Sequence, residues 1–144
     1  MTQNTFRTPA GREVTAVTAA GMREVDRVAV EEVGLQLLQM MENAGRALSR
    51  HVQEIRDDGS VVVVAGNGGN GGGGLTCARH LANRDVPVRV ILDREPAELS
   101  GAAAHQCRIL EAMDLGVVTG PEAVPRFDEP TVLVDALIGY GVSG

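Results

Sequence analysis

The sequence predicts an α/β fold of the Rossmann-like kind, a three-layer α/β/α arrangement around a mostly parallel sheet, preceded by two N-terminal helices. Three observations lead to this prediction. Apolar residues recur every three or four positions up to residue 55, apolar runs alternate with helical patterns after residue 60, and a glycine-rich stretch directly follows the first of those runs. We expect residues 1–16 to be an irregular N-terminal segment and residues 17–144 to form the domain.

Two helices are predicted ahead of the sheet. Thr18 is a suitable N-cap for a first helix that continues to about Val33, where Gly34 interrupts the pattern. A second helix is expected from about Leu35 to Ile55, because its apolar positions form one stripe that we expect to face the core. The stripe consists of Leu37, Met41, Ala44, Leu48, Val52 and Ile55.

Four apolar runs predict the strands, and two helical segments separate the first three of them. The strands are expected at Val61–Ala65, Val86–Leu92, Val117–Thr119 and Thr131–Leu137, and the helices at Gly74–Asn83 and, capped by Ser100, up to Met113. Right-handed crossovers place the first three strands in the order 3-2-1 and the fourth beside the first. Open α/β sheets bind ligands where the strand order reverses, which here lies between the first and fourth strands.

Composition narrows the function classes. The net charge is −6 and all 13 basic residues are arginine, so the surface is a poor match for nucleic acid and resembles that of proteins from salt-adapted organisms. No apolar run is long enough to cross a membrane and the N-terminus has no secretion signal, so we expect a cytoplasmic protein without a membrane partner. Cys77 and Cys107 show no metal-ligand spacing and are expected to be reduced thiols.

Seven of the nine residues from Gly66 to Gly74 are glycine, which demands a reason because glycine loses more backbone entropy on folding than any other residue. One interpretation is a dinucleotide-binding turn. The segment Gly66–Gly71 satisfies G-x-G-x-x-G, and Asp93 stands where an acidic ribose ligand is expected. A phosphate-binding P-loop is excluded, because Leu75 occupies the position of the required lysine.

Four motifs, in order along the chain, resemble the NAD(P)H-hydrate epimerase family (the YjeF N-terminal domain). They are the helix VTAAGMREVDRVAVEEVG at Val17–Gly34, MENAGR at Met41–Arg46, the glycine run at Gly66–Leu75 and VDALIG at Val134–Gly139. The resemblance covers most of residues 17–144 and implies a Rossmann-like domain that interconverts the R and S epimers of hydrated NADH and NADPH (NAD(P)HX) for metabolite repair. It also implies an NAD(P)HX dehydratase as functional partner and a homodimer.

The resemblance further implies a site with potassium as its cofactor. Asn70 and Asp135 match the family's potassium ligands, and such oxygen donors suit a hard cation. Asp135 is also the candidate acid/base residue, because it is the carboxylate that the sequence places at the point where the strand order reverses. The implied substrate-binding residues are Gly69, Asn70, Gly71, Gly72 and Gly73 in the glycine run, and Gly139, Tyr140 and Gly141 after the fourth strand.

Two departures from the family pattern bear on activity. Gly69 and Gly73 stand where the family has an asparagine and an aspartate, so an acceptor for ribose or nicotinamide groups is missing. The family's downstream D-I-P-S-G motif has no match either, and we expect the chain to be a fragment. Two alternatives to an epimerase therefore stay open. One is a non-catalytic nucleotide-binding or interaction module of the same family, and the other is an NAD-binding dehydrogenase domain that uses Asp93.

Simpler structural roles also stay open for several residues. Asp135 could cap the turn after its strand, and Asn70 could occupy a left-handed turn. Tyr140 fits a lid or a partner surface equally well. Glycine inside a helix usually marks close packing, which we expect of Gly45. The histidines share no ligand spacing and are expected to have structural roles; they are His51, His80 and His105.

Overall fold

The computed structural model describes residues 6–140, and the chain divides into two compact units, residues 1–36 and 37–144. The first unit contains a short antiparallel pair, β1 (Phe6–Arg7) and β2 (Glu13–Val14), where the sequence predicted an irregular segment. Two backbone hydrogen bonds between Thr8 and its partners Gly11 and Arg12, of 2.8 and 2.9 Å, close the turn between these strands. Because this pairing is closed by a turn and is not marked by a run of apolar residues, the apolar pattern of the sequence did not predict it.

The first helix begins where the sequence predicts. α1 (Ala19–Arg27) follows Thr18, whose hydroxyl accepts a hydrogen bond from the N–H of Gly21 at 3.1 Å, so Thr18 is confirmed as the N-cap. The predicted helix is not uniform, because after α1 the chain widens into the π-helical turn η1 (Val28–Glu32). Gly34 then takes a φ of +84°, a left-handed conformation that explains why the helix ends there.

The second unit begins with the long helix α2 (Leu37–Ile55). Its buried residues are Met41, Gly45, Ser49 and Val52. The predicted stripe is therefore partly wrong: Leu37 and Ile55 are 50% and 70% exposed, and the buried face instead contains a glycine and a serine. These small residues let α2 approach its neighbour closely, which a pattern based on large apolar residues does not reveal.

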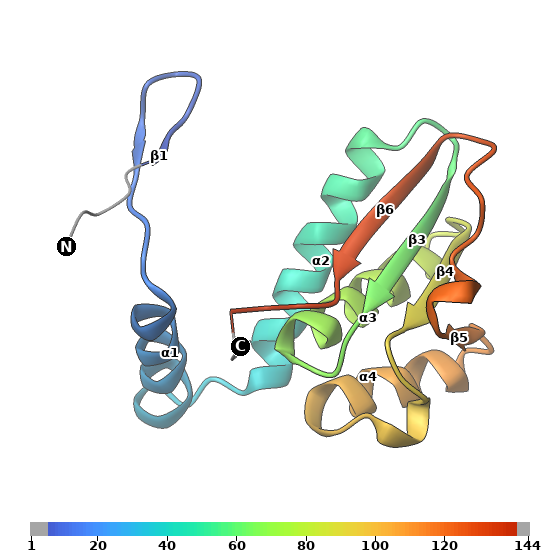
Figure 1. The fold of residues 1–144 in the computed structure, drawn as a ribbon. Coiled ribbons are helices and arrows are strands. Elements are labelled where there is room, and N and C mark those ends of the chain that lie inside the picture. Colours follow the sequence, from blue (N-terminus) through green and yellow to red (C-terminus); the bar gives the residue numbers. More distant parts are fainter. Residues whose placement is uncertain (1–5, 141–144) are drawn as a thin grey trace. The chain divides into compact units, whose positions relative to one another are not determined.

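Four parallel strands form the sheet of the second unit (Figure 1). They are β3 (Ser60–Ala65), β4 (Val88–Leu92), β5 (Val117–Thr119) and β6 (Thr131–Ala136). Their order is β5-β4-β3-β6, which confirms the predicted topology. Val63 lies at the centre, in register with Val90 on one side and Val134 on the other, and is fully buried.

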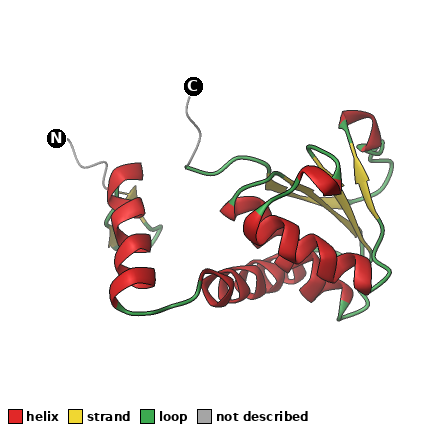
Figure 2. Ribbon diagram, turned by 90° about the horizontal axis from the view of Figure 1, so that it is seen from below, coloured by secondary structure: helices red, strands yellow, loops and turns green. Residues whose placement is uncertain are grey.

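Helices cover one face of this sheet (Figure 2). α3 (Gly69–Ala82) lies between α2 and α4 (Gly101–Ala112), and its buried side chains meet those of β3, β4 and β6 in one core. The opposite face leaves Val118 and Leu133 42% and 53% exposed. The α/β class is thus confirmed, while the third layer of the predicted arrangement contains no α-helix within residues 37–140.

None of the helices among residues 6–140 is long and apolar enough to cross a membrane.

Candidate functional site

Three strand ends meet around Gly66, at the place where the strand order reverses. The Gly66 N–H donates to the carbonyl of Ala136 at 3.1 Å, and the Asp93 N–H donates to the carbonyl of Ala65 at 3.1 Å. A Cβ on Gly66 would overlap the carbonyl oxygen of Leu137. The ends of β3, β4 and β6 therefore converge on one buried backbone position, which is the predicted binding region.

The glycine run is mostly helix rather than loop. α3 begins at Gly69 with Gly68 as its N-cap, whereas the sequence predicted a start near Gly74. Glycine disfavours helix by about 1 kcal/mol per residue relative to alanine, so local propensity alone argues against this start. Close contacts supply the reason for three of these residues. A Cβ on Gly71 would overlap the Gly66 carbonyl, one on Gly72 would lie 2.6 Å from the Met41 sulfur, and one on Gly74 would overlap the Ala136 side chain.

Three other glycines of the run face open space. A Cβ built on Gly68, Gly69 or Gly73 has no heavy atom within 4 Å among the described residues. The first two form the exposed N-terminus of α3, where helix N–H groups have no partner within the helix. The run thus combines glycines that the packing requires with glycines that leave the backbone accessible.

Asn70 connects the first turn of α3 to the segment after β6. Its side-chain amide nitrogen donates to the carbonyl of Ile138 at 3.1 Å, and a Cβ on Gly139 would lie 3.2 Å from the Asn70 Cβ. Asn70 is helical and does not have a positive φ, so the alternative of a left-handed turn is wrong. The structure therefore brings the predicted residues Asn70 and Gly139 together.

Asp135 lies on β6, and its side chain is exposed. Its carboxylate accepts a hydrogen bond from the Leu137 N–H at 3.1 Å, which is the turn-capping role considered from the sequence. Because Val134 and Ala136 face the core beneath α3, Asp135 projects from the opposite face of the sheet. Tyr140 has a half-exposed side chain, and the predicted Gly141 lies outside the described residues.

A polar contact that the sequence did not predict anchors the loop between β3 and α3. The Asn67 side-chain oxygen accepts from the Ser100 N–H at 2.7 Å, and its amide nitrogen donates to the Ser100 hydroxyl at 3.1 Å. Ser100 is the N-cap residue of α4 as predicted, but its hydroxyl bonds Asn67 instead of its own helix. The amino end of α4 is thereby tied to the glycine loop.

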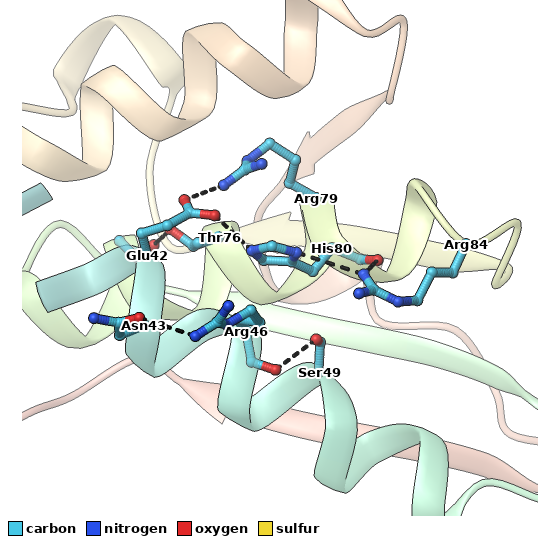
Figure 3. Close-up of polar contacts among 9 residues, drawn as sticks. Glu42, Asn43, Arg46, Ser49, Thr76, Arg79, His80 and Arg84 are labelled. Carbon is cyan, nitrogen blue, oxygen red and sulfur yellow. Dashed lines mark hydrogen bonds and ion pairs between the residues drawn. The ribbon is translucent and has the colours of Figure 1, made fainter. Parts of the chain in front are cut away.

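The MENAGR motif is joined to α3 by the charged cluster in Figure 3. Glu42 forms an ion pair with Arg79, and its second carboxylate oxygen lies 2.7 Å from Nε2 of His80. Arg84 donates to the carbonyl of His80 at 2.8 Å. One turn along α2, a Cβ on Gly45 would lie 2.6 Å from Thr76, so the predicted packing role is confirmed. This motif holds the glycine helix in place.

Asp93 and Arg94 form a paired acid and base at the end of β4. Arg94 donates to both carboxylate oxygens, from Nε at 3.0 Å and from Nη2 at 2.8 Å. The bonds from Arg94 hold the pKa of Asp93 below its usual value, so the carboxylate is ionised at neutral pH. The pair is a second charged feature beside the glycine loop.

Comparison with known proteins identifies the family. Residues 37–144 match the model of the family described as YjeF-related protein N-terminus. The chain belongs to this family. It is 44% identical to an NAD(P)H-hydrate epimerase from Dehalogenimonas lykanthroporepellens, over 96% of this chain and 57% of that protein. An NAD(P)H-hydrate epimerase from Rhodopirellula baltica is 34% identical over 87% of this chain and 52% of its own length.

Two further comparisons also cover only part of the matched proteins. It is 36% identical to a protein named bifunctional NAD(P)H-hydrate repair enzyme Nnr from Salinibacter ruber, over 88% of this chain and 26% of that protein. The crystal structure of yeast ynu0 superposes with a TM-score of 0.77 at 24% identity, covering 91% of this chain and 59% of the yeast chain. The fold is thus shared, and the chain spans about half the length of the epimerases that it matches.

Proposed function

We propose that this protein is an NAD(P)H-hydrate epimerase that interconverts the R and S forms of hydrated NADH and NADPH. The observation that carries the proposal is the convergence of the family's glycine segment with the end of β6. Asn70 reaches the Ile138 carbonyl, and Gly66 leaves no room for a side chain beside Leu137. Two motifs that lie about 70 positions apart in the sequence thus lie side by side, which supports a ligand site at the point where the strand order reverses.

The N-terminus of α3 is the proposed position of the pyrophosphate. Gly68 and Gly69 are exposed and a Cβ on either would meet nothing within 4 Å, so a ligand can approach the backbone closely. The first N–H groups of the helix supply donors and a partial positive charge, both of which favour phosphate. With the pyrophosphate there, the hydrated nicotinamide ring extends over the end of β6.

Asp135 is the proposed acid and base. Epimerisation removes the hydroxyl group from the hydrated carbon as water and adds a water molecule to the opposite face of the ring. A carboxyl group donates the proton that the leaving hydroxyl needs and recovers a proton from the incoming water. The Leu137 N–H occupies one oxygen of Asp135 at 3.1 Å and orients the group, so the second oxygen is the one that exchanges the proton.

Potassium belongs to the same proposal, and the donor chemistry fits it. The amide nitrogen of Asn70 is engaged by the Ile138 carbonyl, which leaves the amide oxygen as the donor for a cation. The Asp135 oxygen that accepts the Leu137 N–H has a further lone pair. This oxygen and the carbonyls of the exposed segment after β6 are also hard oxygen donors, the kind that such ions prefer. Bound potassium would supply positive charge beside the anionic substrate. A homodimer, a separate dehydratase partner and a cytoplasmic location stay predictions.

A non-catalytic nucleotide-binding module of the same family is the second candidate, and the observation that favours it is Gly73. The family's aspartate is replaced there by a residue whose surroundings are open, so the carboxylate is absent although space for it is present.

The two candidates are separated by a coupled assay in potassium buffer. The purified chain is mixed with the epimer that an NAD(P)HX dehydratase does not accept, together with that dehydratase. An epimerase accelerates consumption in proportion to its concentration, and the D135N variant does not. Unchanged consumption combined with measurable binding of the nucleotide leaves only the binding module.

A further inference from the structure

The carboxylate of Asp93 borders the first glycine of the site. Its Oδ2 lies 3.5 Å from the position that a Cβ on Gly66 would take. The Asp93 N–H still donates to the carbonyl of Ala65, so β4 stays paired with β3 up to this residue and fixes where Asp93 stands. Nothing in the proposed chemistry at Asp135 uses this group.

The ion pair between Arg94 and Asp93 leaves hydrogen-bonding capacity on both side chains. Its Nε and Nη2 make the two bonds to the carboxylate, and Nη1 makes neither of them. Each carboxylate oxygen can accept a further hydrogen bond. The Asp93 side chain is 30% exposed and the Arg94 side chain 42% exposed, so a ligand in the site can reach both.

The strand order puts this pair on one side of the glycine loop and Asp135 on the other. β3 lies between β4 and β6, with neighbouring strands about 4.8 Å apart. A dinucleotide whose pyrophosphate lies on the N-terminus of α3 and whose nicotinamide lies over β6 therefore extends its adenosine toward the end of β4. In dinucleotide-binding βαβ units, an acidic residue at this position bonds the ribose 2′-hydroxyl, and a nearby arginine accommodates a 2′-phosphate.

We propose that the Asp93–Arg94 pair reads the 2′ position of the adenosine ribose and keeps the site open to both NADHX and NADPHX. The proposal rests on the proposed function for the identity of the ligand. Asp93 accepts the 2′-hydroxyl of NADHX, and Arg94 donates from Nη1 to the 2′-phosphate of NADPHX. Because each charge offsets the other, neither form of the ribose is rejected, and removal of one partner leaves a selective site.

Two variants with opposite expected effects test this proposal. Calorimetric titration with ADP and with 2′-phospho-ADP reports on the adenosine end without requiring catalysis. We expect R94Q to weaken 2′-phospho-ADP roughly tenfold relative to ADP, because it removes a charge-assisted bond and leaves an unpaired carboxylate. D93N is expected to shift the same ratio several-fold in the other direction.

Matched control variants are available on β4 itself and in the turn that precedes it. Arg89 is an exposed arginine of β4, and Asp85 is an exposed aspartate with a φ of +56° that asparagine tolerates. R89Q and D85N are expected to leave both affinities within about twofold of the wild type, since surface charges this far along a strand act weakly.

Opposite shifts in R94Q and D93N support the proposal. Shifts in the same direction, an unchanged ratio, or no binding of either nucleotide by the wild type would overturn it. This test of ribose recognition can fail or succeed independently of the test of epimerase activity. Opposite shifts without any epimerisation would refute the epimerase alone, whereas epimerisation of both substrates with an unchanged ratio in the variants would refute the reading of the ribose alone.

Discussion

Gly71 in the first turn of α3 touches the backbone of Gly66 at the end of β3. A Cβ on Gly71 would overlap the Gly66 carbonyl oxygen, while a Cβ on Gly73, two positions later in the same helix, would meet no atom within 4 Å. One glycine is required by backbone packing, and the other is not. The glycine run therefore contains glycines that backbone packing requires and glycines that it does not require.

The first prediction compares alanine at these two positions. G71A should lower the free energy of unfolding by about 1–3 kcal/mol, because a backbone carbonyl must move. G73A should leave it unchanged or raise it by about 0.5–1 kcal/mol, because alanine favours helix over glycine. Urea denaturation followed by circular dichroism measures both values. Equal destabilisation by the two variants would contradict the assigned packing.

The second prediction restores the missing carboxylate. G73D should fold like the wild type, because the added side chain enters open space. If the family's aspartate contributes one charged hydrogen bond to the substrate, kcat/KM for NADHX should rise roughly tenfold or more. Epimerase kinetics with G73N as the neutral control provide the measurement. A G73D variant no better than G73N would show that this position does not account for any loss of activity.

The third prediction concerns Glu42 and its partners on α3. The side chains of Arg79 and His80 are only 17% and 12% exposed, and Arg79 Nε is buried without a hydrogen-bond partner among the described residues. E42Q should therefore cost about 1–3 kcal/mol of stability, because it leaves a part-buried charge uncompensated. The matched control is E54Q. Its partner His51 is 79% exposed, so that change should stay within about 0.5 kcal/mol. Thermal denaturation measures both losses of stability. Equal losses in E42Q and E54Q would contradict the structural role of Glu42.

The fourth prediction uses the buried thiol of Cys77, whose pKa is raised by burial from 9.0 to about 12. Well below pH 9 the thiol is neutral in both the folded and the unfolded chain, so it adds no pH dependence there. As the pH rises from 9 toward 12, the unfolded chain ionises first, and the free energy of unfolding should fall. Denaturation at a series of alkaline pH values measures the slope. If C77A showed the same fall of the free energy of unfolding with pH as the wild type, other groups would be responsible for that fall.

The strand order could be predicted from the sequence because it follows from general rules. Apolar runs marked the strands, and the handedness of crossovers placed the fourth strand beside the first. That placement brought the glycine run and the segment after Asp135 to one edge of the sheet without any knowledge of side-chain contacts. The N-cap at Thr18 was predictable for a similar reason, since its partner is only three residues away.

The start of α3 and the buried face of α2 could not be predicted in this way. Both depend on how closely two backbones approach, which selects glycine and serine against their local preferences. The bonds from Asn67 to Ser100 and from Glu42 to His80 join residues 33 and 38 positions apart. Because a periodic pattern relates only residues that are close in the sequence, it does not predict such contacts. These contacts were therefore found only in the structure.

Epimerase activity of this chain is tested most directly with one purified epimer of NADHX and no second enzyme. In potassium buffer, chromatography follows the appearance of the other epimer over time. The rate at which the second epimer appears should rise in proportion to protein concentration and return to the buffer rate with D135N. A rate equal to that of buffer at every concentration of the folded wild-type chain would contradict the epimerase assignment.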